Sequence, residues 1–547
     1  MRKFIFFFLG MFFFFLGMFF PQQAAAITQI VNAGEVLDGG DVHTVVTQRV
    51  YGTTKNFTVS GNQPVMSGGE AYNSNIFPYG QQNVEKGGVS HNTNVQYYAV
   101  QNVNGEAYSS TVASQGIVDV NAGGYAQDTV VNGGMLVVSS GAEVKGTVLN
   151  GGRENVSGTD EAASVKSGLQ QILNGGVSKY ASVSGGLQQV EAGGSSIGAV
   201  VSGRGRQKVW GTAEQTSVQK GGIVDVMEGG SVRETAVSGG ELVVNPDAFS
   251  YNTQMSSGTL SVFGTDTDSI ISGGVQQVES GGIALNSQVR SGGVQSVFSG
   301  GKAENTTIDK GGWLFLFSGG SLAGTTKVTE GVVTVVGSNN ISDMQLQNAA
   351  VNIPFSHDFS TLQFDSLNGN GLFGINSSLS EGLSDKILVH SGTGNFGLII
   401  HDYSPDGNIP AKFKIIDEDS GAADSFYLVG DAVDVGAFRY GLRQEGDDWV
   451  LVRSQDVSAV IAKNTYSSLA SLFYTHLTPV YNHIRSRRNA SGHDNGLWVK
   501  GLGQELKFGY KDGTHSKIDI YGTEIGYDRE VWRNAGHYIS FGVYGGY

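Results

Sequence analysis

The stretch that decides the fold is Ile271–Gly320, ISGGVQQVESGGIALNSQVRSGGVQSVFSGGKAENTTIDKGGWLFLFSGG. Its Gly-Gly pairs begin at positions 273, 281, 292, 300, 311 and 319, so their spacing alternates between 8 and 11 residues. The same phase therefore returns every 19 residues, which is typical of a repeat architecture. Glycine reaches positive φ at no steric cost, so each pair predicts a sharp corner. The expected corner residues are Gly273, Gly274, Gly281, Gly282, Gly292, Gly293, Gly300, Gly301, Gly311 and Gly312.

The segments between the corners are rich in Val, Ile, Gln, Ser and Thr, which favours strands. One 19-residue coil cannot bury its apolar side alone, but stacked coils share a core and pair every backbone amide. The sequence thus predicts an all-β fold, a right-handed β-solenoid. Some 300 residues would give about sixteen coils and a rod of roughly 75 Å, with no evident pocket.

Within each short half-repeat, two aliphatic positions lie three residues apart, as in Val275 and Val278 or Val294 and Val297. This spacing is not strict alternation, so the first residue of each pair is expected to pack at the corner. A polar slot follows other glycine pairs by four residues, and stacking of its side chains along the rod is favoured over a binding row. The slot contains Asp128, Tyr180, Glu234, Asn286 and Asn305.

The chain has 547 residues, with 82 glycines, 8 prolines and only 15% charged residues, which fits a repeat rod better than several compact domains. It has 34 basic and 49 acidic residues, a net charge of −15, which argues against nucleic acid and anionic membrane surfaces as partners. There is no cysteine, which suits a chain that crosses an oxidising compartment unfolded.

Residues 1–26 have the pattern of a secretory signal: a basic start, an apolar run and the small-residue triplet that ends at Ala26. Cleavage is expected after Ala26. The apolar run is long, so the alternative is an uncleaved membrane anchor.

Behind this signal, the 19-residue Gly-Gly repeats resemble the passenger of autotransporter (type V secretion) adhesins involved in diffuse adherence. The resemblance covers about residues 30–336, and the corresponding domain is expected at 27–340. Residues 433–452, VDVGAFRYGLRQEGDDWVLV, are similar to the end of a pertactin-like passenger, with Tyr440, Leu442, Trp449 and Leu451 in place. The resemblance implies a better-packed cap over 341–455 that assists folding during export, and larger apolar residues there fit a stable nucleus.

Residues 456–492 switch to apolar steps of three and four, which predicts a linker helix with a break at Pro479. Residues 493–547 alternate again, with Tyr521, Thr523, Ile525 and Tyr527 on one face. This is the pattern of an outer-membrane barrel strand, and the segment resembles the start of an autotransporter barrel. Because about three strands cannot close a barrel, truncation is expected.

Motifs for catalysis are weak. Gly194–Gly198 matches G-x-S-x-G around Ser196 but no helix is expected to follow, and two G-x-G-x-x-G matches, at 369–374 and 392–397, are interpreted as turns. His476 and His483 are favoured as a solvated helix flank over a metal site. The acidic residues Asp225, Glu228 and Glu279 are too dispersed for glycan cleavage. No catalytic residue, metal or cofactor is predicted.

The run Trp313–Phe317 is either an exposed adhesive patch or, as favoured here, a buried junction. The interpretation of the whole is a surface-displayed adhesin, or an autoaggregation and biofilm factor. Its passenger would lie on the cell surface or be secreted after transit through the periplasm, and its C-terminal domain would lie in the outer membrane. Expected partners are host-cell or neighbouring-cell surface ligands, a second copy of the chain, and the secretion and barrel-assembly machinery. The alternatives are a truncated non-functional remnant and a passenger enzyme acting on polysaccharide.

Overall fold

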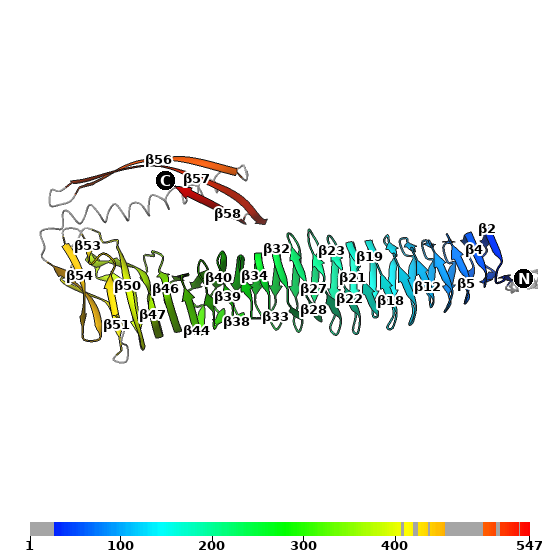
Figure 1. Cartoon of the computed structure of the whole chain (residues 1–547), viewed down its shortest axis with the longest axis horizontal. Coiled ribbons are helices and arrows are strands. Elements are labelled where there is room, and N and C mark those ends of the chain that lie inside the picture. The colour runs from blue at the N-terminus through cyan, green and yellow to red at the C-terminus, as the bar shows by residue number, and fades with distance from the viewer. Residues whose placement is uncertain are drawn as a thin grey trace, which may run out of the picture. The chain divides into compact units, whose positions relative to one another are not determined.

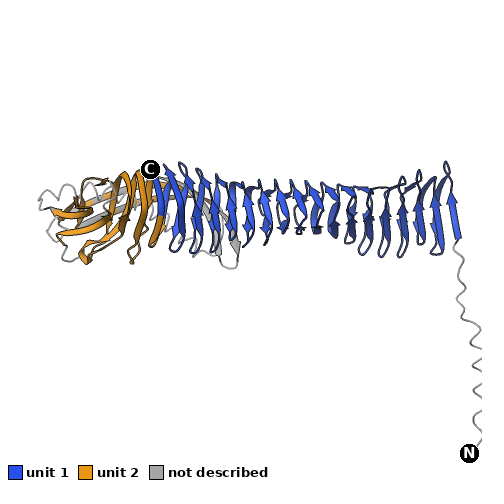
Figure 2. Cartoon of the chain, turned by 90° about the horizontal axis from the view of Figure 1, so that it is seen from below, with its two compact units in different colours: residues 1–334, 342–345 blue, residues 335–341, 346–547 orange. Residues whose placement is uncertain are grey.

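The structure is a computed structural model, and it describes residues 27–405, 410–419, 425–435, 438–454, 496–509, 515–534 and 537–546. The signal segment, its cleavage point at Ala26 and the predicted linker helix lie outside these ranges. Two compact units are present, residues 1–334 with 342–345, and residues 335–341 with 346–547 (Figure 2). Within the described ranges, no helix has the length and hydropathy of a membrane span.

Unit 1 is a β-solenoid in which each coil has three short strands (Figure 1). One coil consists of β37 (Gly274–Val278), β38 (Ile283–Leu285) and β39 (Gln288–Val289). These strands pair in parallel with β40 (Gly293–Val297), β41 (Lys302–Glu304) and β42 (Thr307–Ile308) of the next coil. The strands therefore form three faces, named here the first, second and third face in that order. The solenoid predicted from the Gly-Gly period is confirmed.

The remaining strands of unit 1 follow the same arrangement. The first face contains β1 (Ile27–Val31), β3 (Val46–Val50), β5 (Asn62–Val65), β8 (Gln81–Val84), β11 (Val100–Val103), β14 (Ile117–Val120), β17 (Met135–Val138), β24 (Leu187–Val190), β27 (Arg206–Val209), β30 (Ile223–Val226) and β43 (Trp313–Phe317). The second face contains β6 (Glu70–Tyr72), β9 (Val89–His91), β12 (Glu106–Tyr108), β15 (Tyr125–Gln127), β18 (Glu143–Lys145), β20 (Thr159–Glu161), β22 (Val177–Lys179), β25 (Ser195–Ile197), β28 (Thr212–Glu214), β31 (Ser231–Arg233), β33 (Phe249–Tyr251) and β35 (Thr265–Thr267). The third face contains β7 (Asn75–Ile76), β10 (Asn94–Val95), β13 (Thr111–Val112), β16 (Val130–Val131), β23 (Ser182–Val183), β26 (Val200–Val201), β29 (Ser217–Gln219) and β36 (Ile270–Ile271). Seven longer strands continue from one face to the next: β2 (Val36–Val42), β4 (Thr53–Val59), β19 (Val148–Val156), β21 (Ser164–Ile172), β32 (Ala236–Val244), β34 (Gln254–Val262) and β44 (Ser321–Thr329).

The coils differ in length. Val275 pairs with Val294, nineteen residues on, whereas Thr259 pairs with Val275 after only sixteen. The uniform coil of 19 residues therefore holds for the stretch that defined the period but not for the whole unit, because corners of different length connect strands of the same register.

The core of unit 1 follows alternation along most of its strands, with three consecutive buried residues in β5 and β40 as exceptions. In β37, Gln276 and Val278 are fully buried, while Val275 and Gln277 are partly exposed. Val275 thus lies within the strand with its side chain partly exposed, and the expectation that it packs at the corner is wrong. Because successive residues of a strand point to opposite faces, burying Val278 also buries Gln276 and turns Val275 outward.

Unit 2 has wider coils and ends in antiparallel strands. β47 (Thr361–Ser378) pairs in parallel with β49 (Lys386–Val389) and β50 (Gly392–Asp402). The remaining elements before its last sheet are β46 (Asn339–Asn352), η1 (Leu379–Glu381), β48 (Leu383–Ser384), β51 (Lys412–Glu418), β52 (Ser425–Leu428), β53 (Val433–Val435), β54 (Phe438–Glu445) and β55 (Asp448–Ser454), and β45 (Val332–Val336) spans the boundary between the units. β53, β54 and β55 pair antiparallel, and β55 pairs with β51.

An aromatic column occupies the core of unit 2. Neighbouring rings lie with centroids 5.5 to 5.9 Å apart, mostly edge to face. The rings belong to Phe364, Phe373, Phe396, Phe426 and Trp449. Tyr440 is fully buried and donates its hydroxyl to the Pro410 carbonyl. Because aromatic side chains bury large apolar areas, this unit has the larger residues that its sequence led us to expect.

Residues 496–546 form a separate antiparallel sheet of β56 (Gly496–Gly509), β57 (His515–Asn534) and β58 (His537–Gly546). Tyr521, Ile525 and Tyr527 are exposed and Glu524 is buried, so β57 has the alternation expected from its sequence. A Cβ at Gly526 would lie 2.4 Å from the Trp498 ring, so glycine there makes room for the indole.

Candidate functional site

The glycine pairs have two different roles within one corner. Gly281 has φ +83° and its Cβ position is open, whereas a Cβ at Gly282 would meet the Val262 carbonyl oxygen at 2.0 Å. The first glycine therefore provides the left-handed turn, and the second allows the backbone of the preceding coil to approach. The pairs at 292, 300 and 311 repeat this order, with positive φ at Gly292, Gly300 and Gly311 and a Cβ at Gly293, Gly301 or Gly312 within 2.6 Å of a carbonyl oxygen of the coil before. At the pair Gly273 and Gly274 the order is reversed, and Gly274 has the positive φ.

The polar slot is a second left-handed corner, between the second and third faces. Its five predicted residues, Asp128, Tyr180, Glu234, Asn286 and Asn305, all have φ between 53° and 56°. Asn286 Nδ2 donates to Asp268 Oδ1 at 3.0 Å, and Asn305 Nδ2 donates to Asn286 Oδ1 at 3.5 Å. The expected bonding along the rod is thus present at these positions. Asn and Asp tolerate the left-handed region better than other residues do, which explains their frequency here.

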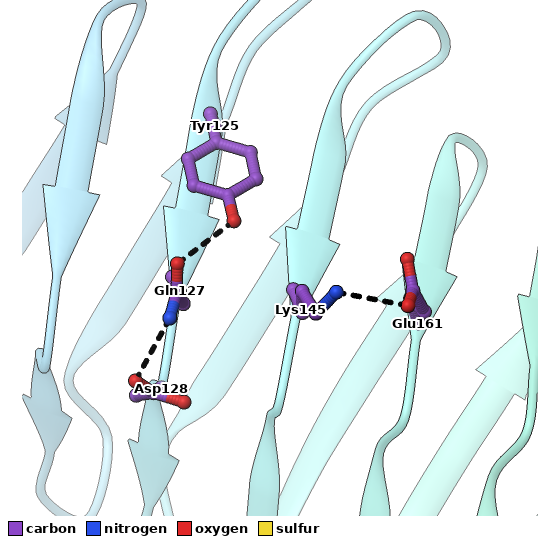
Figure 3. Close-up of polar contacts among 5 residues, drawn as sticks. All are labelled: Tyr125, Gln127, Asp128, Lys145 and Glu161. Atoms are coloured by element: carbon purple, nitrogen blue, oxygen red, sulfur yellow. Dashed lines mark hydrogen bonds and ion pairs between the residues drawn. The ribbon is translucent and has the colours of Figure 1, made fainter.

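The outer surface of the second face has polar side chains that contact one another within and between coils. Tyr125 donates its hydroxyl to Gln127 Oε1 at 3.0 Å, and Gln127 Nε2 donates to Asp128 Oδ2 at 3.1 Å (Figure 3). In the next two coils, Lys145 Nζ lies 2.9 Å from Glu161 Oε1, and Figure 3 shows this pair bridging adjacent strands. Both ionic side chains are nearly half exposed, so this pair adds little stability and is screened by salt.

Rows of buried glutamines run inside the first face, and the Gly-Gly pattern did not predict them. Gln188 Nε2 donates to Gln170 Oε1 at 2.8 Å, and Gln207 Nε2 donates to Gln188 Oε1 at 2.6 Å. A serine of the second face gives the amide oxygen of Gln188 a further hydrogen bond, since Ser196 Oγ donates to Gln188 Oε1 at 3.1 Å. Three such rows are fully buried: Gln48, Gln63, Gln82 and Gln101; Gln170, Gln188 and Gln207; Gln276 and Gln295. The signal for two of them is a glutamine pair between aliphatic residues, as in 169–172, 187–190 and 275–278, in which alternation turns the first glutamine inward.

Two of the rows begin at buried carboxylates. Gln170 Nε2 donates to Glu154 Oε2 and to Asp160 Oδ2, each at 2.8 Å, and Gln276 Nε2 donates to Asp266 Oδ2 at 2.6 Å. Burial raises the pKa of Asp160 to about 7 and that of Asp266 to about 6. Burial and the neighbouring Asp160 raise the pKa of Glu154 well above its usual value. A row of amides that all donate in one direction needs an acceptor at its start, and these carboxylates provide it.

The candidate catalytic motifs do not form a reactive centre. Ser196 is fully buried in β25, and its hydroxyl is used in the bond to Gln188. Asp225 pairs with Arg206 at 3.1 Å. The register places Glu279 three coils from Asp225, about 14 Å along the rod.

The two G-x-G-x-x-G matches lie in strands, so their interpretation as turns is wrong. Residues 369–374 belong to β47 and residues 392–397 to β50, and Gly369 pairs with Gly394. A Cβ at Gly392 would lie 1.9 Å from the Leu367 carbonyl oxygen, so glycine serves close approach of the two strands rather than a turn.

The structure describes no group of three or more His, Asp or Glu side chains placed to hold a metal ion in its described ranges. His476 and His483, the histidine pair considered from the sequence, lie outside those ranges.

The run Trp313–Phe317 is only half buried, so its interpretation as a buried junction is wrong. Leu314 and Leu316 are fully buried, whereas Trp313 is 44% exposed. Phe317 stacks on Phe298 of the preceding coil at 4.8 Å. Alternation along β43 explains this result, because five consecutive apolar residues cannot all face the core of a single strand layer.

A β-solenoid of stacked coils and an aromatic-rich unit fit the class of autotransporter passengers, and comparison with known families supports this class over part of the chain. Residues 277–331 match the family model described as adhesin of bacterial autotransporter system, probable stalk, and residues 340–453 match the model described as pertactin. These matches support an autotransporter passenger, with similarity to an adhesin stalk at residues 277–331 and to pertactin at residues 340–453.

Individual relatives agree with this class over part of their length. The chain is 32% identical over 120 residues to an immunoglobulin A1 protease autotransporter of Haemophilus influenzae, which covers 20% of this chain and 7% of that protein. It is 23% identical over 229 residues to the BrkA autotransporter of Bordetella pertussis, covering 39% and 22% respectively. The chain thus spans less than a quarter of the length of either relative.

Solved structures with some similarity include a TibC-catalyzed hyper-glycosylated TibA fragment, at 29% identity and a TM-score of 0.33, over 61% of this chain and 97% of that one. The Hap adhesin of Haemophilus influenzae aligns at 11% identity and a TM-score of 0.34, over 75% and 64%.

Proposed function

We propose that this passenger is displayed on the surface of a bacterium and acts as an adhesin that holds cells to other surfaces or to one another. The observation that carries the proposal is the adhesin-stalk match at residues 277–331, which falls on the most regular coils of the rod. A stack of coils presents the same kinds of side chain about every 4.8 Å, so many weak contacts can act together.

A non-enzymatic role is part of this proposal. The interior of the rod is filled by the glutamine rows and by aliphatic residues, and its fully buried carboxylates, Glu154, Asp160 and Asp266, are bonded to those rows. Ser196, the one nucleophile suggested by a motif, has its hydroxyl bonded inside the core. These features give the buried polar groups a structural role.

The organisation proposed for the chain remains that of the sequence: a signal at 1–26 cleaved after Ala26, a solenoid at 27–340, a cap at 341–455, a linker at 456–492 and the start of a membrane barrel at 493–547. The outer membrane would anchor the rod, and the secretion and barrel-assembly machinery would be its partners during export. Host-cell or neighbouring-cell ligands would be its partners afterwards.

A mixed-cell experiment tests the proposal and separates its two forms. Producing cells and non-producing cells would carry different fluorescent labels, and sedimentation, microscopy of aggregates and attachment to epithelial cells would be scored. Aggregates of producing cells alone indicate self-association, and attachment of producing cells alone indicates a host ligand. Equal behaviour of producing and non-producing cells, with the rod detected on the surface by antibody, would refute the proposal.

A further inference from the structure

An open notch lies at the corner between the third and first faces near the start of unit 1, where no pocket was expected from the Gly-Gly repeat. Its volume is about 320 Å³, at the lower end of the range for ligand sites. The polar and aromatic side chains that line it are those of Thr44, Thr47, Ser60, Asn62, Tyr79 and Gln81.

Differences in corner length create the notch. The connector from Val59 to Asn62 has two residues, whereas the next one, from Ile76 to Gln81, has four. The short corner is held tightly, because a Cβ at Gly61 would lie 2.1 Å from the His43 carbonyl oxygen. A short corner between longer neighbours leaves a gap one coil wide on the side of the rod.

One wall of the notch is the first ring of a stack of exposed tyrosines. Tyr79 is 76% exposed, and its ring lies 5.7 Å from that of Tyr98 in the next coil, at an interplanar angle of 23°. Tyr97 packs on Tyr98 with ring centroids 4.1 Å apart. Of the three rings only that of Tyr79 lines the notch, and Tyr98, one coil further on, supports it from the side away from Thr44 and Ser60.

The backbone at this wall is strained. Tyr79 and Tyr98 have φ of 67° and 57°, a region that is unfavourable for bulky residues. Gln115 occupies the same place in the following coil at φ 58°, and Gly133 takes the left-handed position in the coil after that. Glycine would hold these corners without strain, so the tyrosines are there for their side chains and not for the turn.

The lining chemistry selects the ligand. None of the described residues that line the notch carries a carboxylate, an ammonium or a guanidinium group, so a charged ligand would find no partner there. Hydroxyl and amide side chains on the floor can exchange hydrogen bonds with the hydroxyls of a sugar. A sugar ring also has an apolar C–H face that packs on an aromatic ring, as on the tyrosine wall.

We infer that this notch binds a neutral saccharide, with the ring of Tyr79, supported by Tyr98, as the stacking wall and the side chains of Thr44, Ser60 and Asn62 as the polar floor. This inference deepens the proposed adhesin function and rests on it, since it names the chemical class of one ligand of the rod.

The test measures binding by the full chain to an array of immobilised neutral glycans ending in glucose, galactose, mannose or N-acetylhexosamine, with unstructured peptides on the same array. The test variant is Tyr79→Gly with Tyr98→Gly, which removes both rings and relieves the strain. Gln115→Gly is the matched control, since it makes the same change at the same corner one coil on. Tyr79→Phe with Tyr98→Phe keeps the ring faces.

We expect the glycine double variant to lose affinity for the bound glycan by about tenfold or more, while the Gln115→Gly and phenylalanine variants keep it. The glycine variant should also melt no lower than the parent chain, which shows that the loss is not unfolding. Binding of no glycan, binding that the glycine variant keeps, or binding of peptides alone would each overturn the inference.

The same variants separate this inference from the proposed function. Cells that adhere or aggregate while the purified chain binds no glycan would refute the notch and leave the adhesin. A chain that binds glycans on cells that neither adhere nor aggregate would refute the adhesin and leave the notch. If the glycine variant abolishes self-association without glycan, the notch is a contact between copies, and the saccharide assignment is wrong.

Discussion

The buried carboxylate of Asp266 makes the stability of its coils depend on pH, and Asp266→Asn should remove this dependence. Asp266 is fully buried and accepts hydrogen bonds from Ser250 at 2.5 Å, Ser269 at 2.8 Å and Gln276 at 2.6 Å. Asparagine has the same shape and no charge. Its carbonyl can accept from Gln276, and its amide can donate to the two serine hydroxyls, which turn to accept.

The magnitude follows from the shifted pKa. Burial raises the pKa of Asp266 from 3.8 to about 6, so the folded coil binds this proton more tightly than the unfolded chain does. Its contribution to stability is therefore complete below about pH 4 and is lost as the pH rises to about 6. A shift of roughly two units corresponds to about 3 kcal/mol, or on the order of a hundredfold in the equilibrium for opening the coil.

Hydrogen exchange measured by mass spectrometry is the suitable assay, because a rod of coils opens locally and a single unfolding transition does not describe it. Protection of amides in residues 249–297 would be measured from pH 4 to pH 8 and corrected for intrinsic exchange. In the parent chain, protection should fall by on the order of a hundredfold between pH 4 and pH 6.5. In Asp266→Asn it should stay level over the same interval.

Asp247→Asn is the matched control, since Asp247 lies exposed on a corner of the neighbouring coil and loses the same charge. It should keep the parent's pH dependence. The reasoning is refuted if Asp266→Asn and the parent lose protection equally between pH 4 and pH 6.5, or if the control loses the dependence as well.

Four further substitutions test the packing. Gly281→Ala meets only backbone strain and should lower local stability by about 1 kcal/mol. Gly282→Ala should lower it clearly more, because its Cβ would lie 2.0 Å from the Val262 carbonyl oxygen. Local hydrogen exchange compares the two variants, and equal losses would contradict the two roles of the glycine pair. Gln188→Leu interrupts a buried amide row and should cost about 1–3 kcal/mol for each donor or acceptor left without a partner, measured as lost protection in the coils on either side. Phe396→Ala removes a fully buried ring from the aromatic column of unit 2 and should cost about 3–5 kcal/mol in denaturant unfolding, so a change below 1 kcal/mol would show that the column is not the core.

The sequence predicted the coil because glycine doublets determine where the chain turns, and this determination is local. The period of 19 residues can be recognised without knowing which residues contact one another in the fold, and the parallel pairing of Val275 with Val294 follows from it. The polar slot could also be recognised, since Asn286 and Asn305 stack one coil apart. Both features repeat along one line of the rod.

The parts that could not be predicted depend on what each residue meets across the coil. The spacing of Val275 and Val278 led us to expect that the first of the pair packs at the corner. Alternation along the strand instead buries Gln276, whose amide forms its hydrogen bonds with residues of adjacent coils. The notch depends on the relative lengths of successive corners, a difference that the Gly-Gly spacing does not measure because none of the corners at residues 43–45, 60–61 and 77–80 contains a glycine pair.

The buried amide rows explain how a chain of similar coils keeps one register. Shifting a coil by one residue would turn every side chain to the opposite face. At aliphatic core positions such as Val224 and Leu242, the outward Ile223 or Val243 would then partly replace the buried side chain that was lost. In the row through Gln188 the same shift would leave Gln170 and Gln207 buried without their partner. Since an unpaired buried amide costs more than a misplaced methyl group, the glutamine rows select against slipped stacking. Regular corners therefore set where the coils turn, and the amide rows set which coil position stacks on which. The exposed side chains of this rod are thereby held in straight columns, and adhesion through many weak contacts requires that order.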